Sequence, residues 1–174
     1  MLAPMFVQNL EFDNNPAWCA YQFVNAVVDR GDVDESWKYI HPDLQLARVQ
    51  MWLLRQGLAT PQAPEDDLAA AIVSQEHELW PRFAVASLAR WRTRTYVNAV
   101  RGPWGLLPVE EFPAVDLALI RFGTGEWFGP HGDDIAEFTV TTRYNGQVWP
   151  VAGLGPFLAV PGWPPWEQEL PRAL

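Results

Sequence analysis

The sequence predicts an α+β fold in which N-terminal helices pack on a curved antiparallel sheet that closes the chain. Apolar residues recur at helical spacing up to Trp91, whereas after Pro113 they follow the shorter period of strands. Asn145-Gly146 then separates two apolar runs, residues 138–144 and 147–154, and this pattern is the strongest short-range signal for a β-hairpin. Helices first and strands last are typical of an α+β domain.

One domain accounts for residues 1–174, because a chain of 174 residues falls within the usual size of a single folding unit. Its last segment, residues 156–174, holds five prolines and two tryptophans. Proline lacks the backbone N–H that a helix interior needs, so we expect this tail to be an extended wrap and not a helix.

Two short helices are expected at the start of the chain. Asn14 or Asn15 caps the first, with Pro16 in its first turn, and the helix ends near Gly31. Asp32 caps the second helix.

Residues 44–55, capped by Asp43, fit a third helix or a mixed strand, because their apolar residues show no single period; we favour the helix, ending at Gly57. Pro42 disfavours helical geometry at the residue before it, so His41 is expected to end the second helix.

After a loop at 59–64 the next helix begins with the acidic residues 65–67, since the macrodipole favours negative charge at a helix start. Pro81 restarts that helix, and the part that follows has the clearest amphipathic face of the chain, which predicts packing on a large partner surface. The residues of that face are Trp80, Phe83, Ala84, Ser87, Leu88 and Trp91.

The C-terminal half is expected to form strands. Residues 102–113 suit a loop or an edge segment, and residues 115–120 predict a strand covered on both faces. The Asn-Gly dipeptide predicts a two-residue type I′ turn that places Tyr144 opposite Gln147 and Val140 opposite Val151.

Composition excludes several classes of function. The chain carries 21 acids against 12 bases, a net charge of -9, which repels a phosphate backbone, so no nucleic acid is expected as a partner. The basic run of Arg90, Arg92, Arg94 and Arg101 is interpreted as a solvated helix flank that pairs with acids.

A single cysteine, Cys19, allows no intrachain disulfide and favours a reducing compartment, and on an apolar helix face it is expected to be inert. No stretch of about 18 apolar residues is present, so no membrane segment is expected. We therefore expect a cytoplasmic protein.

Two stretches resemble the NTF2-like superfamily, in particular its SnoaL-like members. The opening run, residues 23–34, leads to Trp37 and His41-Pro42-Asp43, and the closing run is residues 144–153. The resemblance implies a cone-shaped domain whose sheet and helices enclose an apolar cavity, with a homodimer through the sheet. It covers roughly a quarter of the chain, and its motifs report fold more than activity.

The catalytic residues of ketosteroid-isomerase-like members do not carry over. Their helix-one tyrosine matches Val24 here, and Tyr21 lies almost one turn earlier. Their acidic base has no counterpart in residues 46–50. The catalytic residues are therefore unknown, and it stays open whether the protein is an enzyme.

Asp116 is the weak catalytic candidate, because it is the one acid in an otherwise apolar strand and a carboxylate facing a cavity can serve as acid or base. The alternative, a strand-entry aspartate on the exposed face, is favoured by alternation. Tyr21, Asn25, Trp37 and Trp149 are expected to join it as ligand-binding walls of the cavity, although core packing explains the aromatic residues equally well.

No metal site and no cofactor are expected. His41, His77 and His131 are isolated in the sequence, and a metal needs several converging ligands. His131 with Asp133 and Asp134 is interpreted as an acidic glycine-rich loop. No dinucleotide or phosphate-binding glycine pattern precedes a helix.

Two hypotheses of function follow. The first is a protein that binds an apolar small molecule in a cone-shaped cavity, as the resemblance and the ten tryptophans suggest. The alternative is a non-catalytic protein-interaction or scaffold module that uses the sheet face or the C-terminal tail.

Overall fold

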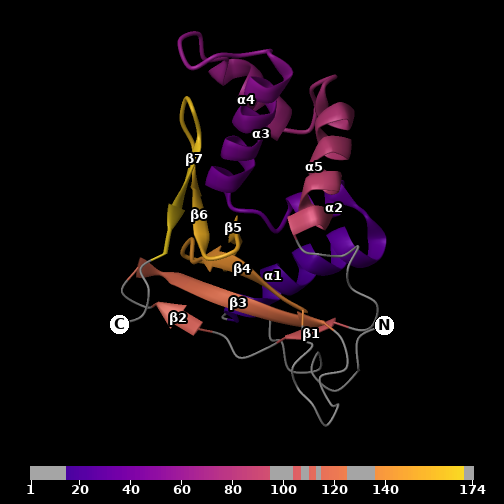
Figure 1. Ribbon diagram of the computed structural model, residues 1–174, viewed down its shortest axis with the longest axis vertical. Coiled ribbons are helices and arrows are strands. Elements are labelled where there is room, and N and C mark those ends of the chain that lie inside the picture. Colours follow the sequence, from indigo (N-terminus) through magenta and orange to yellow (C-terminus); the bar gives the residue numbers. More distant parts are fainter. Residues whose placement is uncertain (1–14, 95–103, 107–109, 113–114, 125–135, 171–174) are drawn as a thin grey trace.

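The computed structural model describes residues 15–94, 104–106, 110–112, 115–124 and 136–170, and it has the α+β organisation that the sequence predicts (Figure 1). Helices fill the first half of the chain and antiparallel strands the second. The elements in order are α1 (Pro16–Asn25), the π-helical turn η1 (Ala26–Arg30), α2 (Val33–Trp37), α3 (Pro42–Gln56), α4 (Asp66–Val73), α5 (Trp80–Arg94), β1 (Trp104–Leu106), β2 (Glu110–Phe112), β3 (Leu117–Thr124), β4 (Ala136–Arg143), β5 (Val151–Leu154), β6 (Phe157–Val160) and β7 (Trp166–Glu169).

Local capping sets the N-terminal helices as expected. The Asn15 side chain accepts a hydrogen bond from the Ala17 N–H at 2.9 Å, and Asp32 accepts one from the Glu35 N–H at 2.9 Å. Between them Gly31 ends η1 with φ 64°, a left-handed conformation that glycine adopts without strain.

The start of α3 differs from the prediction. The helix begins at Pro42, and its cap is His41, whose Nδ1 accepts a hydrogen bond from the Asp43 N–H at 3.2 Å. His41 therefore opens the third helix instead of ending the second. Asp43 lies in the first turn of α3. Pro42 occupies the first helical position, so the capping residue is the one before it, His41. Gly57 ends the helix, as predicted.

An aromatic cluster joins the helices. The Trp37 ring of α2 meets Trp80 and Phe83 of α5 edge-to-face at centroid distances of 5.0 and 5.4 Å, and Phe83 meets Trp52 of α3 at 5.7 Å. The buried face of α5 is the one that the sequence predicts, and Trp91 at its far end is fully buried.

β3 is the central strand of the larger sheet, whose path runs β1-β3-β4-β5, with β2 also paired to β3. All of these strand pairs are antiparallel. The short edge strands β1 and β2 fall within residues 102–113, which the sequence assigns to a loop or an edge. α1 packs on β4, and Val24 of α1 and Val140 of β4 are both fully buried.

The closing hairpin is confirmed, but its register is not. β4 and β5 pair Val140 with Leu154 and Thr142 with Val151, and the register shifts between these pairs. A type I′ turn needs positive φ at both central residues, and only Gly146 of the pair has it. The Asn145 side chain instead accepts hydrogen bonds from the N–H groups of Gln147 and Val148, both at 3.0 Å. The Asn145 N–H donates to the Val148 carbonyl at 3.1 Å, so the turn is shifted by one residue from the predicted position.

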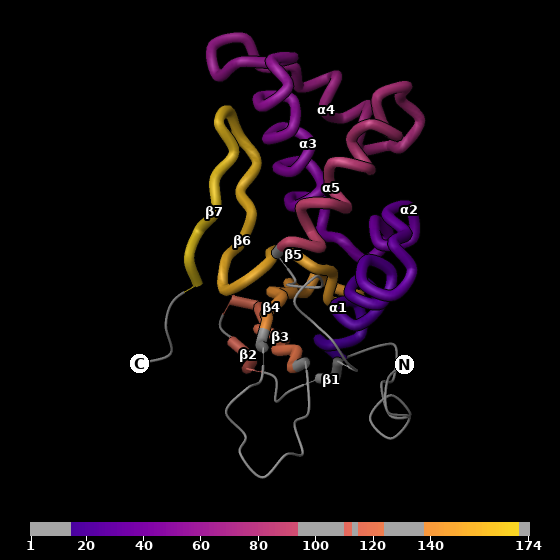
Figure 2. The backbone as a smooth tube through the Cα atoms, turned by 45° about the vertical axis from the view of Figure 1, so that its right-hand side comes forward, coloured from indigo at the N-terminus to yellow at the C-terminus, as the bar shows by residue number. Residues whose placement is uncertain are grey.

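The tail is extended, as expected, but it pairs with itself instead of wrapping as a single strand. β6 and β7 form a second, two-stranded antiparallel sheet that stands beside α3 in both views (Figures 1 and 2). Among the described residues, no helix is long and apolar enough to cross a membrane.

The hairpin is held at both ends. At its base the Gly155 N–H donates to the Thr139 carbonyl at 2.8 Å. At its tip the Gly162 N–H donates to Gln50 Oε1 at 2.9 Å, and Trp163 Nε1 donates to the Asp66 carboxylate of α4. These contacts join β6 and β7 to α3 and α4 as one unit.

Gly153→Ala is expected to destabilise the fold by about 3 kcal/mol, because the added Cβ would lie 1.6 Å from the Phe157 carbonyl oxygen, where the chain turns back into β6. Gly57→Ala is the matched control: φ is +68° with nothing within 4 Å, so it should cost only about 1 kcal/mol of left-handed strain. Urea denaturation measures both. Equal losses in the two variants would contradict the close approach at Gly153.

Candidate functional site

A concave surface lies between three elements that are far apart in sequence. α3 contacts both α5 and β6, and Figures 1 and 2 show α3 between the β6–β7 hairpin and α5. Two adjoining hollows follow this line, and both are lined by Arg48, Met51 and Arg90. We call the two hollows together the α3 groove.

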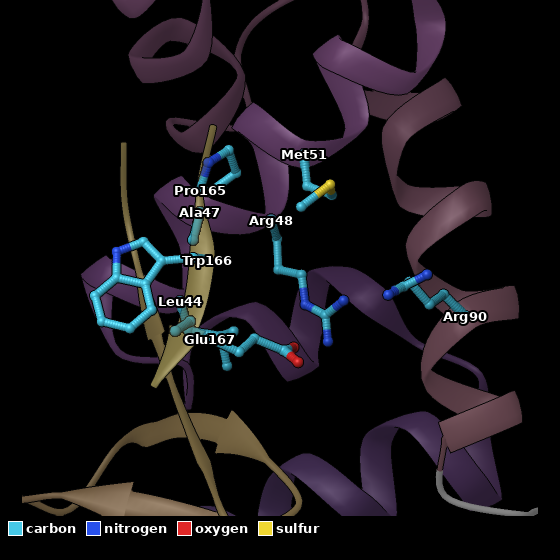
Figure 3. Close-up of a pocket in the computed structure, with 9 residues that line it drawn as sticks. Leu44, Ala47, Arg48, Met51, Arg90, Pro165, Trp166 and Glu167 are labelled. Atoms are coloured by element: carbon cyan, nitrogen blue, oxygen red, sulfur yellow. The ribbon is translucent and has the colours of Figure 1, made fainter. Parts of the chain in front are cut away.

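The first hollow lies between α3 and the hairpin and has a volume of about 210 Å³ (Figure 3). Leu44 and Ala47 of α3 line it and are buried, while Trp166 of β7 also lines it, is 55% exposed, and turns its indole away from Arg48 and Arg90 (Figure 3). Apart from the shared residues, its lining is Leu44, Ala47, Ala159, Pro165, Trp166 and Glu167.

The second hollow lies between α3 and α5 and has a volume of about 180 Å³. Its walls include the aromatic residues Trp52, Phe83 and Trp91. Arg55, Gln56, Ala86 and Ser87 complete it beside the shared residues. The α3 groove is therefore apolar along much of its length and strongly basic where its two halves meet.

The junction of the two hollows concentrates positive charge. Arg48 on α3 is only 9% exposed and Arg90 on α5 is half-buried, and Figure 3 shows their guanidinium groups pointing toward one another. The Glu167 carboxylate extends toward the same space. Among the described residues that line the groove, Glu167 is the one acid against three arginines. Two guanidinium groups and one carboxylate therefore meet where the two hollows join.

A third, smaller hollow of about 140 Å³ adjoins the hairpin near the start of α3. Here Asp43 Oδ2 lies 3.6 Å from His41 Nδ1 and 3.5 Å from Arg143 Nη1. Burial lowers the pKa of His41, the Asp43 carboxylate opposes this shift, and the Arg143 cation adds to it. His41 is thus held neutral, as its role as hydrogen-bond acceptor at the helix cap requires.

The five residues that the sequence assigns to a ligand site do not converge on any of these three hollows. Asp116 is exposed, with φ 53°, in the turn before β3, and its carbonyl accepts a hydrogen bond from the Tyr144 N–H at 2.9 Å. Its placement inside a cavity is therefore wrong. β3 begins at Leu117, two residues later than the predicted strand, so Asp116 lies exposed at the strand entry, which is the alternative that alternation favours.

The remaining four residues serve the core or its rim. Trp37 is buried and its Nε1 donates to the Val73 carbonyl at 3.0 Å. Tyr21 is buried, and burial raises its pKa, with Asp29 adding to the shift. Asn25 is half-buried at the end of α1, and Trp149 packs against Tyr144 at a ring distance of 5.2 Å. These contacts agree with the core-packing alternative for the aromatic residues.

Cys19 is buried on α1, as expected. Burial raises its pKa to about 11, and a hydrogen bond with the Trp149 backbone opposes this shift. The thiol therefore stays protonated near neutral pH. His131, Asp133 and Asp134 lie outside the described residues, and within those residues no group of three His, Cys, Asp or Glu side chains could hold a metal ion.

The residues of the α3 groove were missed by sequence reasoning. Arg90, which the sequence places in a basic helix flank, is half-buried and lines the groove. Arg48 lies on α3 and Trp166 in the tail, and no local pattern relates them. The one available signal was Arg48 itself, a cation within an otherwise apolar helical stretch.

Comparisons of this chain with protein-family models, with curated proteins and with solved structures find no match. The function must therefore be inferred from the groove itself.

His41→Asn is expected to reduce the loss of stability on acidification. Because the pKa of His41 is lower in the folded chain than its ordinary 6.5, the unfolded chain binds more protons as the pH falls below about 7. The contribution of His41 to the free energy of unfolding is therefore fully present above about pH 7 and declines as the pH falls toward 5.5. Asparagine caps a helix equally well but does not titrate. Denaturation at pH 7.5 and 5.5 measures both proteins, and equal losses would contradict the burial of a neutral His41.

Native Cys19 is expected to react with a disulfide reagent at pH 8 about 100-fold more slowly than in the unfolded chain. A pKa of about 11 in place of 9.0 reduces the thiolate fraction by about that factor. Absorbance at full unfolding should then report one thiol per chain. Rapid, complete reaction of the native protein would show that the thiol is accessible.

Proposed function

We propose that the protein binds a small molecule with a large apolar part in the α3 groove. The observation that carries this proposal is the first hollow, which is lined by buried side chains of α3 and by the partly exposed Trp166 of β7. Sites for small molecules are typically concave and mostly apolar, with a few polar groups that fix orientation. The arginine pair at the junction supplies such groups.

The walls of this site are formed before a ligand arrives. The hairpin that carries Trp166 is held at its base by Thr139 and at its tip by Gln50 and Asp66. Because these walls need not become ordered when a ligand binds, less of the interaction free energy is lost as conformational entropy, and the affinity is higher. This arrangement supports binding by a site already open in the free protein.

An NTF2-like assignment is part of the same proposal. In its favour, the opening run folds as α1, η1 and α2, and the closing run forms the β4–β5 connection and most of β5. The proposed site, however, lies outside the contact of α1 with the sheet. A homodimer through the sheet is the matching proposal for assembly.

A second candidate is a protein-interaction module that uses the tail. β7 is exposed along its whole length, and Trp166 is among the most exposed large apolar residues of the described chain. An exposed strand edge can pair with a strand of another protein. The experiment below separates this candidate from the first.

Native mass spectrometry of the protein purified from its own host should show a retained small molecule. Trp166→Ala should lose it, because the substitution removes an outer wall of the first hollow, and the exposed Trp166 can be changed with little cost to the core. Val85→Ala is the control: Val85 is 73% exposed on α5 and lines neither hollow.

The same spectra give the subunit count. An empty protein that co-purifies with a second polypeptide would contradict the pocket and favour the interaction module. Retention of the compound by Trp166→Ala would place its site outside the first hollow.

A further inference from the structure

We propose that His41, Asp43 and Arg143 form a proton-operated switch at the start of α3. When His41 takes up one proton, the Asp43 carboxylate changes its partner from Arg143 to His41, and the Arg143 side chain is released from the third hollow. The switch needs no ligand, so its test is independent of the function proposed for the α3 groove.

The neutral state is held by a hydrogen bond that only a neutral ring can accept. The Asp43 N–H donates to His41 Nδ1 at 3.2 Å, so the proton of the neutral ring lies on Nε2. The His41 backbone is fixed at the same point, because its N–H donates to the Val151 carbonyl at 2.7 Å and its carbonyl accepts from the Gln45 N–H at 3.0 Å. The ring is therefore anchored between β5 and α3.

One carboxylate oxygen lies near both basic side chains. Asp43 Oδ2 is 3.6 Å from His41 Nδ1 and 3.5 Å from Arg143 Nη1. A proton taken from solvent forms an N–H bond at Nδ1 and gives the ring one positive charge. Nδ1 can then no longer accept the Asp43 N–H, but it can donate to Oδ2. Proton uptake therefore replaces the backbone hydrogen bond by an ion pair with the same residue.

Burial decides which cation keeps the carboxylate. The His41 side chain is 14% exposed, whereas that of Arg143 is 47% exposed. Water and salt screen an exposed ion pair more strongly than a buried one, so the Arg143–Asp43 contact is the weaker of the two once His41 is charged. The two cations also repel each other, and Arg143 is the one that can move into solvent.

Within the described residues, Asp43 and Arg143 are the charged side chains that face His41 across the third hollow. On the side of α2, the Tyr39 hydroxyl donates to Glu35 Oε1 at 2.8 Å, and burial raises the pKa of Tyr39, so it stays neutral where histidine titrates. Burial lowers the pKa of His41 below 6.5, so the switch operates in mildly acidic solution. The other residues that line the hollow are uncharged: Ala152, Leu158, Ala159, Val160, Pro161 and Gln168.

NMR of the full chain labelled with nitrogen-15, titrated from pH 7.5 to 5.0, tests the switch. At pH 7.5 the His41 ring should carry its proton on Nε2, and at low pH both ring nitrogens should be protonated. The Arg143 Nε–H resonance should shift with the same midpoint as the His41 ring, while the backbone amide spectrum verifies at each pH that the chain is folded. An Arg143 resonance that stays in place while His41 titrates overturns the proposal.

His41→Asn should abolish the shift of Arg143, because asparagine caps a helix but does not titrate. His77→Asn is the matched control and should leave that shift unchanged. His77 Nδ1 likewise accepts an N–H from two residues further on, that of Leu79 at 3.1 Å, yet in the described part of the chain it takes part in no ion pair. A shift that persists in His41→Asn, or one that is lost in His77→Asn, overturns the role of His41.

Arg143→Gln gives a second measurement, which is read from the His41 ring alone. Removal of the competing cation should raise the midpoint of His41, and Asp43→Asn should lower it, since the carboxylate stabilises the charged ring. Both replaced side chains are about half exposed, so the fold should tolerate the changes. An unchanged midpoint in Arg143→Gln would show that the two cations do not compete for Asp43, and it would overturn the proposal.

Discussion

The edge-to-face packing of Trp37 against Trp80 and Phe83 fixes the position of α5, and the α3 groove depends on that position. Both indole N–H groups are also satisfied: Trp37 donates to the Val73 carbonyl at 3.0 Å and Trp80 donates to Asp34 at 2.8 Å. Buried tryptophans with fixed ring contacts and fixed hydrogen bonds leave a helix little freedom to shift. Arg90, ten residues further along α5, is thereby carried to a defined place opposite Arg48.

The second constraint is the close return of the chain after β5. Gly153 lies so near the Phe157 carbonyl that no side chain fits between them. The chain turns back at this contact, and β6 then runs beside α3 (Figure 1). The hydrogen bond from Gly162 to the buried Gln50 fixes the far end of the hairpin. The groove thus has two independently fixed walls, one made by aromatic packing between helices and one made by a backbone contact between strands.

Interactions that span a few residues could be predicted from the sequence, and those that span the chain could not. The caps at Asn15, Asp32 and Gly57 depend on neighbours two to four residues away, and all three were found. The Asn145-Gly146 hairpin exists, but its register depends on which way the Asn145 side chain turns. The Arg48–Arg90 junction joins α3 to α5 and needs Trp166 from the tail, so only the folded chain reveals it.

Electrostatics distinguish the α3 groove from an ordinary gap in packing. Arg48 is only 9% exposed, so its guanidinium loses hydration that neighbouring groups must replace. The Arg90 guanidinium points toward it and adds a like charge, which makes that loss harder to offset (Figure 3). Aliphatic residues at both positions would close the gap without that cost. The Glu167 carboxylate of β7 lines the same hollow and places an opposite charge beside the two guanidinium groups, so the hairpin contributes to the electrostatic balance between α3 and α5.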